Sequence, residues 1–119
     1  MKHEKYQGKE SDLQKTVARY LNALGLVWFH CPNGGNRSMS EAKRFKAEGV
    51  KSGVPDVMVI EPNGKYNGLA IELKVGYNKP NNNQKEWLNN LQSKGFYTFW
   101  SNSLDEILEK IDLYLKNDL

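Results

Sequence analysis

The chain has 119 residues, a formal net charge of +3 and a sequence pI near 8.9, with a single cysteine. This length fits one domain, and the lone Cys31 excludes an internal disulfide and a cysteine-rich zinc site, which fits a reducing compartment. No stretch approaches the roughly 18 apolar residues of a membrane span, and the N-terminus lacks an apolar signal core, so we expect a cytoplasmic protein. The mildly basic balance is compatible with nucleic acid, but many other classes of protein share it.

The first nine residues are polar, and we expect them to form a flexible N-terminus ahead of a single domain that spans 10–119. A helix is predicted from about Glu10 to Leu24, because apolar residues recur at helical spacing and Gly25 is typical of the position that follows a helix. Glu10 then lies in the first turn, where a carboxylate is favourable at the positive end of the helix dipole.

The segment Leu26–His30 is predicted to be the first strand, and its apolar density favours a buried one. A loop from Pro32 to Arg37 follows, and its glycines allow the backbone to approach a ligand closely. Asn33 and Arg37 would then contact phosphate, while His30 would donate to phosphate or shuttle a proton. A plain glycine turn after a strand-end histidine is an equally good interpretation.

A short helix is predicted over Glu41–Glu48, with Ser40 as its N-cap and Gly49 at its end. Four cations give this region a basic surface that would follow a phosphate backbone, or that is simply the solvated side of a helix. These cations are Lys43, Arg44, Lys46 and Lys51.

Residues 53–74 predict two strands joined by a turn, and the rest of the domain is organised around them. Val57–Ile60 and Leu69–Leu73 are short apolar runs separated by a Pro-Asn-Gly stretch. If the turn centres near residues 63–65, antiparallel pairing sets Asp56 roughly across from Glu72 and Lys74. One aspartate, one glutamate and one lysine then meet at one end of a mostly apolar hairpin.

Two adjacent carboxylates repel each other, and either protons or a cation must relieve that repulsion. A hard divalent ion such as Mg²⁺ suits them, because it takes oxygen ligands and usually keeps several waters. A neighbouring lysine can hold a nucleophilic water or stabilise charge on a phosphate. The alternative is a charged strand end whose Glu and Lys pair in solvent.

The last third of the chain predicts a helix, a strand and a helix. A polar loop leads into a helix that ends near Lys94, with Gln84 in its first turn and a core stripe of Trp87, Leu88 and Leu91. Phe96–Trp100 reads as the last strand. A capping-box pattern from Ser103 to Glu106 then begins an amphipathic helix whose apolar residues are Leu104, Ile107, Leu108, Ile111 and Leu115. The order of elements predicts an α/β fold with a small mixed sheet flanked by helices.

Pro55-Asp56 followed by Glu72-Leu73-Lys74 resembles the motif of the PD-(D/E)xK nuclease superfamily. From about residue 10 to 100, an ordered set of segments resembles one branch of that superfamily, the VRR-NUC domain. The matching segments are Glu10–Gln14, His30–Gly35 with Arg37, Lys46–Gly49, Ser52–Asp56, Gly68–Lys74 and Gln84–Leu88.

The resemblance implies a restriction-endonuclease-like αβββαβ core and an endonuclease that hydrolyses DNA phosphodiesters with Mg²⁺ or Mn²⁺. It implies that Asp56, Glu72 and the backbone carbonyl of Leu73 bind the metal, and that Lys74 positions and activates the attacking water. Glu10 would complete the acidic cluster directly or through water, and Gln84 would orient Lys74 or the water.

Small stand-alone members of this branch resemble enzymes of phages and bacteria that act as homodimers on four-way (Holliday) DNA junctions. The resemblance therefore implies a homodimer and a branched DNA substrate in a bacterial or phage-infected cell. Two alternatives stay open at this point: a non-catalytic subunit that binds branched nucleic acid, and a nuclease of ordinary duplex or single-stranded DNA. The presence of Asp56, Glu72, Lys74 and Glu10 together argues against the first alternative.

Overall fold

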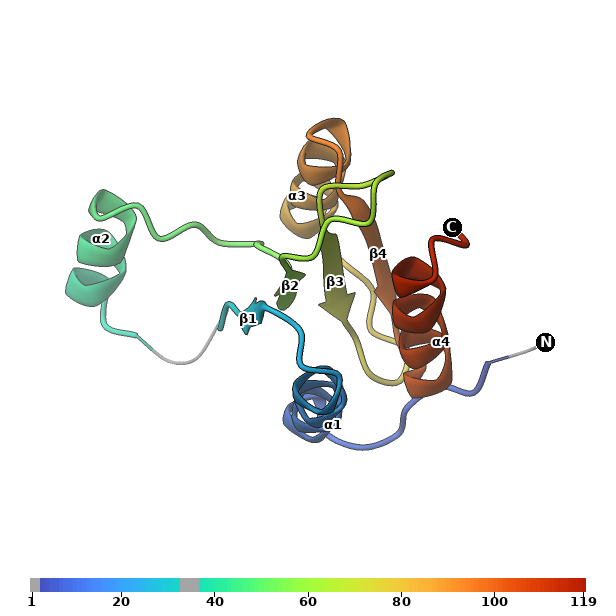
Figure 1. Cartoon of the computed structure of the whole chain (residues 1–119). Coiled ribbons are helices and arrows are strands. Elements are labelled where there is room, and N and C mark those ends of the chain that lie inside the picture. The colour runs from blue at the N-terminus through green and yellow to red at the C-terminus, as the bar shows by residue number, and fades with distance from the viewer. Residues whose placement is uncertain (1–2, 33–36) are drawn as a thin grey trace.

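The computed structural model describes residues 3–32 and 37–119, and it confirms the predicted mixed α/β fold and the predicted order of elements (Figure 1). Within the described residues there are four helices and four strands. Their bounds are α1 (Glu10–Ala23), β1 (Trp28–His30), α2 (Met39–Ala47), β2 (Val57–Val59), β3 (Leu69–Leu73), α3 (Asn82–Ser93), β4 (Tyr97–Ser101) and α4 (Leu104–Leu115).

The four strands form one sheet in the order β1-β2-β3-β4. β1, β2 and β3 run antiparallel in succession, whereas β4 joins parallel to β3 after the crossover through α3. In the predicted turn between β2 and β3, the Asn63 side-chain oxygen accepts from the backbone N–H groups of Lys65 and Tyr66. Val57 lies opposite Ile71, so the register is the one predicted from the turn, and the next pair outward is Asp56 and Glu72.

The two faces of the sheet are covered by different helices. On one face, α1 and α4 pack against alternate residues of β2, β3 and β4 and form the main core. On the other face, α3 packs against β3 and β4 (Figure 1). By the alternation of side chains along a strand, Met58, Ala70 and Glu72 point toward the α3 face.

The prediction that the first strand is buried is wrong. Phe29 of β1 is 51% exposed, and Val27 just before it is 64% exposed. β1 lies at the edge of the sheet and pairs with β2, while α3 contacts the two strands at the opposite edge. β1 is apolar but exposed on one side, because α3 covers β3 and β4 on this face of the sheet and does not extend to β1.

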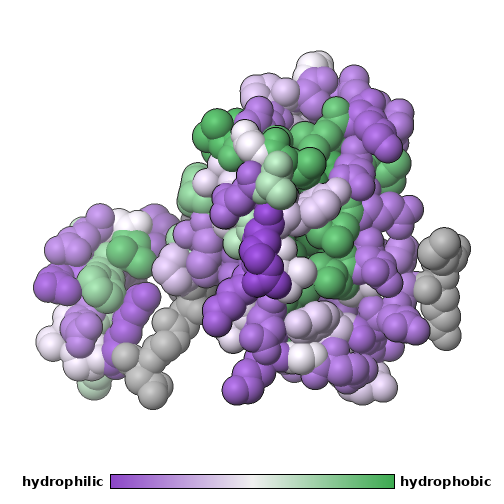
Figure 2. Space-filling model, turned by 60° about the horizontal axis from the view of Figure 1, so that its bottom comes forward, coloured by the Kyte–Doolittle hydropathy of each residue, from purple (hydrophilic) through white to green (hydrophobic). Residues whose placement is uncertain are grey.

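The short helix α2 begins earlier than predicted, because its N-cap is Ser38 and not Ser40. The Ser38 hydroxyl accepts from the backbone N–H of Glu41 at 3.1 Å, which makes Ser38 and Glu41 the capping pair. No residue of α2, all of which the structure describes, is buried. Figures 1 and 2 show α2 as a separate, mainly hydrophilic lobe beside the sheet.

The flexible segment predicted for residues 1–9 stays a prediction, but its described part contacts the body at Tyr6. The Tyr6 N–H donates to the Asn102 carbonyl at 2.7 Å, and the Gly76 N–H donates to the Tyr6 carbonyl at 2.9 Å. These bonds join the N-terminal segment to the loops that follow β3 and β4.

In α4 the buried residues are Ile107, Ile111 and Tyr114, while Leu115 is 38% exposed. Tyr114 follows Ile107 and Ile111 at helical spacing, so it takes the core position that the apolar pattern gave to Leu115. Its hydroxyl donates to the carbonyl of Glu61 at 2.8 Å and thereby ties α4 to the turn between β2 and β3.

Replacing Tyr114 by Phe should lower the free energy of unfolding by about 1 kcal/mol, because the part-buried Glu61 carbonyl loses its donor while the ring stays in place. Chemical denaturation would measure the change. The matched control is Tyr77→Phe, since Tyr77 is 83% exposed and its loss of a hydroxyl should leave stability unchanged. Equal stability of Tyr114→Phe and wild type would contradict the structural role given to this bond.

Candidate functional site

The strand register places two carboxylates side by side in a buried position. Asp56 precedes β2 directly, and Glu72 is the fourth residue of β3, on the neighbouring strand. Asp56 is 8% exposed and Glu72 is 2% exposed. Buried carboxylates are rare without a partner, so the groups around them indicate what this arrangement can do.

Asp56 is held in place through both its side chain and its backbone. Its Oδ2 accepts from the backbone N–H of Leu73 at 2.8 Å. Its carbonyl accepts from the backbone N–H of Cys31 at 3.1 Å and lies 2.7 Å from His30 Nδ1. Since a carbonyl only accepts, Nδ1 is the donor in this bond.

Lys74 lies beside the two carboxylates. Its Nζ is 3.2 Å from Glu72 Oε2, and its backbone N–H donates to the Ser101 carbonyl at 2.9 Å. The first contact fixes the charged end of the lysine, and the second joins its backbone to β4. The predicted meeting of Asp56, Glu72 and Lys74 at one end of the hairpin is therefore what the structure shows.

The second oxygen of Glu72, Oε1, is buried and has no hydrogen-bond partner among the described residues. Burial, together with the charge of Asp56, raises the pKa of Glu72 from 4.5 to about 8, although Lys74 lowers it in part. Burial also raises the pKa of Asp56, against the opposing effects of the Leu73 N–H, His30 and Lys74. The pair therefore needs a proton or a cation between its oxygens.

Glu10 belongs to the same electrostatic cluster. Burial and then the charge of Asp56 raise its pKa, while Lys74 and His30 lower it. The start of α1 thus brings the predicted Glu10 within electrostatic range of the hairpin residues. Within residues 3–32 and 37–119, however, no three His, Cys, Asp or Glu side chains are grouped closely enough to hold a metal ion.

A divalent metal that keeps several waters fits the pair of carboxylates. Mg²⁺ takes oxygen ligands and commonly uses one or two protein carboxylates with water. Asp56 and Glu72 provide two such groups, and Glu72 Oε1 is a buried acceptor to which no described donor extends. The donor set therefore suits a hard cation with two carboxylates and does not supply a full cage of side chains.

Gln84 lies in the first turn of α3, as predicted, and it forms hydrogen bonds with Asn81. Its side-chain oxygen accepts from the Asn81 N–H at 2.9 Å, and its own N–H donates to the Asn81 side chain at 2.9 Å. This reciprocal pair is a capping box that starts α3. The role of Gln84 toward Lys74 stays a prediction.

The predicted DNA-binding residues lie in two places, apart from Asn33, which falls outside the described residues. His30 lies beside Asp56, as above. The others are on α2 or next to it: Arg37, Lys43, Arg44, Lys46 and Lys51. All five are exposed, and the guanidinium carbons of Arg37 and Arg44 lie 4.7 and 4.9 Å from the centroid of the Phe45 ring.

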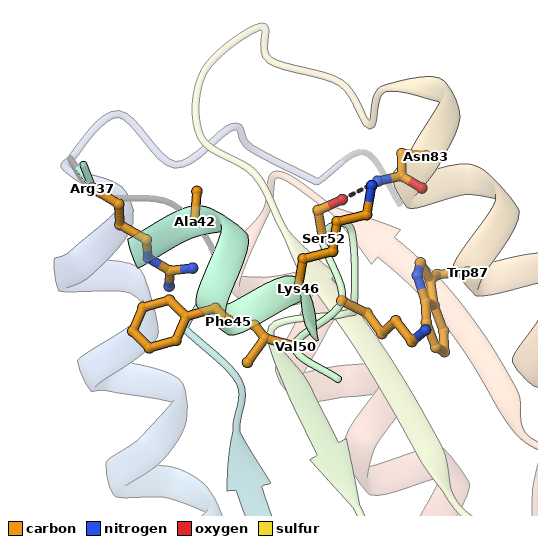
Figure 3. A pocket seen from close by; sticks show the side chains of 9 residues that line it. Arg37, Ala42, Phe45, Lys46, Val50, Ser52, Asn83 and Trp87 are labelled. Carbon is orange, nitrogen blue, oxygen red and sulfur yellow. Dashed lines mark hydrogen bonds between the residues drawn. The ribbon is translucent and has the colours of Figure 1, made fainter. Parts of the chain in front are cut away.

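A groove of about 470 Å³ lies between α2 and α3, and we call it the α2–α3 groove (Figure 3). The groove could not be predicted from the sequence, because it is formed by residues far apart in the chain. Trp87, which was predicted to lie in the core stripe, is half-buried and lines this groove, whereas Leu88 is 8% exposed and packs inward. The groove is lined by Arg37, Ala42, Phe45, Lys46, Val50, Lys51, Ser52, Asn83 and Trp87.

The raised pKa of Glu72 predicts how stability depends on pH. The folded protein holds a proton that the unfolded chain releases near pH 4.5, so stability should fall from about pH 4.5 to 8. Glu72→Gln removes this titration. In EDTA its melting temperature should exceed that of wild type above pH 8, and the difference should shrink toward pH 4.5. Parallel pH dependence of the two proteins would contradict the buried, ionisable state of Glu72.

Comparisons with known proteins agree with this geometry. The family model of the VRR-NUC domain matches residues 4–103. A solved structure described as a VRR_NUC domain protein is 28% identical, with a TM-score of 0.78, and the match covers 92% of this chain and 91% of that one. A second, described as a VRR_NUC domain, is 25% identical, with a TM-score of 0.62 over 88% of this chain and 96% of that one. No curated protein matches the chain.

Among the described helices, none has both the length and the apolar character that crossing a membrane requires. The family match includes Glu10, Asp56, Glu72, Lys74 and Gln84, so every predicted catalytic position lies inside it. Because the matched region covers most of the sequence and carries the buried carboxylate pair, the chain belongs to the VRR-NUC domain family, a family of nuclease-type domains.

Proposed function

We propose that this protein is a Mg²⁺- or Mn²⁺-dependent endonuclease that hydrolyses DNA phosphodiesters at the Asp56–Glu72–Lys74 site. The observation that supports this most directly is the buried pair of carboxylates with Lys74 Nζ 3.2 Å from Glu72 Oε2. Burying two carboxylates at the end of apolar strands destabilises the fold when nothing neutralises them. The same pair is well suited to bind a cation beside a lysine.

Asp56 and Glu72 would hold the metal, with the backbone carbonyl of Leu73 as a further ligand. When bound, such an ion polarises phosphate oxygens and lowers the pKa of coordinated water. The Leu73 N–H keeps Asp56 Oδ2 oriented, which leaves the rest of that carboxylate available as a ligand.

Lys74 would hold the attacking water and steady the negative charge that develops on the phosphate. The Ser101 carbonyl accepts from the Lys74 N–H and fixes the backbone position from which the Lys74 side chain extends to the site. Glu10 would complete the acidic cluster from the start of α1, directly or through water, since its carboxylate lies within electrostatic range of Asp56 and Lys74. Gln84 would orient Lys74 or the water from the first turn of α3.

The substrate we propose is branched DNA, with a four-way junction cut by a homodimer. A two-fold dimer presents two equivalent sites, which suits a junction that needs one cut in each of two strands. Exposed apolar side chains on the edge strand β1 and beside it support self-association, since Phe29 and Val27 are both more than half exposed. Phe99 of β4 and Tyr114 of α4 are buried in the core, so these two aromatic side chains are not available for a dimer contact.

The site assignment predicts that Glu72→Ala and Lys74→Ala each reduce DNA cutting by roughly 100-fold or more, because each removes a group that acts on the metal or the water. Folding and DNA binding should persist. The assay compares labelled four-way junction, matched duplex and single strand in Mg²⁺, Mn²⁺ and EDTA. Lys94→Ala, which removes the same charge from the far end of α3, is the matched control and should cut normally.

The same assay separates the candidate activities. Metal-dependent cutting of the junction alone, lost in Lys74→Ala, supports the junction-resolving enzyme. Equal cutting of all three substrates keeps the nuclease and rejects the junction preference. Binding without cutting in any metal would make this a non-catalytic module, and wild-type cutting by either variant would make the site assignment wrong.

The proposed dimer predicts a molecular mass in solution of about twice 13.7 kDa, measured by light scattering coupled to size exclusion. Phe29→Asp places a charge on the exposed side of β1 and should shift the protein toward monomer. Tyr77→Asp, at a side chain that is 83% exposed on a loop, is the matched control and should leave the mass unchanged. A wild-type mass of one chain at micromolar concentration would exclude a stable dimer.

A further inference from the structure

The α2–α3 groove has the charge of a phosphate-binding surface. Its lining includes three cations, Arg37, Lys46 and Lys51, and no carboxylate. Acidic residues are present nearby on α2, at Glu41 and in the helix C-cap, but they do not line the groove. Cations gathered without acidic partners repel one another, and a polyanion relieves that repulsion.

Aromatic rings lie on both sides of the groove. Phe45 belongs to α2 and Trp87 belongs to α3, and both side chains are half-buried (Figure 3). Cationic side chains interleaved with aromatic rings are typical of surfaces that bind unpaired nucleic acid, because each unpaired base offers a face for stacking. A duplex keeps its bases stacked inside, so it can use the cations of such a groove but not the rings.

The wall of the groove formed by α3 is held firmly. The Asn83 side-chain amide donates to the Ser52 hydroxyl at 2.7 Å, as drawn in Figure 3. Gly53 has φ +83° and lies so close to Asn83 that a Cβ atom there would come within 2.9 Å of the Asn83 side chain. The segment leading to β2 is therefore packed against the start of α3, and Trp87 lies one turn further along that helix.

One residue that lines the groove is close in sequence to the candidate active site. Ser52 lines the groove, and Asp56 lies only four residues later. Four residues span at most about 14 Å even when fully extended. A DNA strand that lies in the groove can thus place a phosphate a few nucleotides away at the carboxylate pair.

From these observations we propose that the α2–α3 groove binds an unpaired DNA strand, with its phosphates held by Lys46 and Lys51 and a base stacked on Trp87. The inference rests on the proposed function in taking DNA as the ligand, and it adds the feature that the protein recognises. Substrates that expose unpaired nucleotides beside the cut, at an opened branch point or a flap, are then favoured over continuous duplex.

The test measures binding of fluorescein-labelled oligo(dT) and of a matched duplex by anisotropy, in EDTA, on the full chain carrying Glu72→Gln. Adding Trp87→Leu should weaken oligo(dT) binding about tenfold and change duplex binding less than twofold, since only the unpaired strand stacks. Trp87→Phe should retain oligo(dT) binding, because a ring face remains. Thermal unfolding checks that each variant is folded.

The two lysines are tested through salt dependence. The double variant Lys46→Ala, Lys51→Ala should reduce the slope of log affinity for oligo(dT) against log salt by roughly 1.4, at about 0.7 for each phosphate contact. Lys94→Ala, with a single charge removed at the far end of α3, should leave the slope unchanged. An unchanged slope in the double variant would overturn the placement of the phosphates.

Tryptophan fluorescence gives a second reading that does not depend on the stability of Trp87→Leu. Oligo(dT) should quench the emission of the Glu72→Gln protein, and this quenching should disappear when Trp87→Phe is added, although binding persists. Quenching that persists in Trp87→Phe would overturn the proposal. Normal oligo(dT) binding by Trp87→Leu would also overturn it. A shift of that variant from dimer to monomer with unchanged DNA affinity would overturn it as well, since a second copy of the chain would then be the occupant of the groove.

The outcomes also separate this inference from the nuclease proposal. Because binding is measured without metal and with Glu72 replaced, it does not require a cutting activity. Stacking on Trp87 without any cutting by the wild-type protein would support the binding of an unpaired strand in the groove and would exclude the endonuclease activity. Normal cutting by a Trp87→Leu protein that binds oligo(dT) as wild type does would reject the groove and keep the endonuclease.

Discussion

The burial of two carboxylates side by side, Asp56 and Glu72, is the constraint on which the site depends. Placing two carboxylates on neighbouring strands and burying both is unfavourable, and the raised pKa of Glu72, to about 8, expresses that cost. The surrounding structure compensates only in part, through the Leu73 N–H on Asp56 and the Lys74 ammonium on Glu72. The apolar packing of β2 and β3 against α1 and α4 supplies the stability that keeps the pair together.

Much of this site could be predicted from the sequence, because it depends on a local feature. A short apolar strand, a turn and a second apolar strand determine the register, and the register determines that Asp56 faces Glu72. Lys74 follows by the two-residue period of a strand. The helix from Glu10 and the Ser103 cap of α4 also follow from short patterns, since caps and periodicity depend on neighbours in sequence.

The features that could not be predicted depend on which helix covers which part of the sheet. Phe29 looks like a core residue in the sequence, and it is exposed because α3 packs over β3 and β4. Trp87 has the spacing of a core residue, yet it lines a groove whose other wall is α2, some 40 residues earlier in the chain. Ser40 and Ser38 are both reasonable N-caps, and only the backbone geometry distinguishes them.

The bond between the Lys74 N–H and the Ser101 carbonyl links the site to the order in which the protein is made. The hairpin that carries Asp56 and Glu72 is local in sequence, whereas β4 joins β3 as a parallel neighbour only after α3 has crossed the sheet. Non-local parallel pairing forms late, because a long loop must close first. The hairpin alone therefore does not complete the site, because Lys74 is held by β4 and the acidic pair is kept together by packing against α1 and α4. The arrangement of Asp56, Glu72 and Lys74 thus belongs to the whole domain, and a fragment that ends before β4 would carry the three residues without the contacts that hold them.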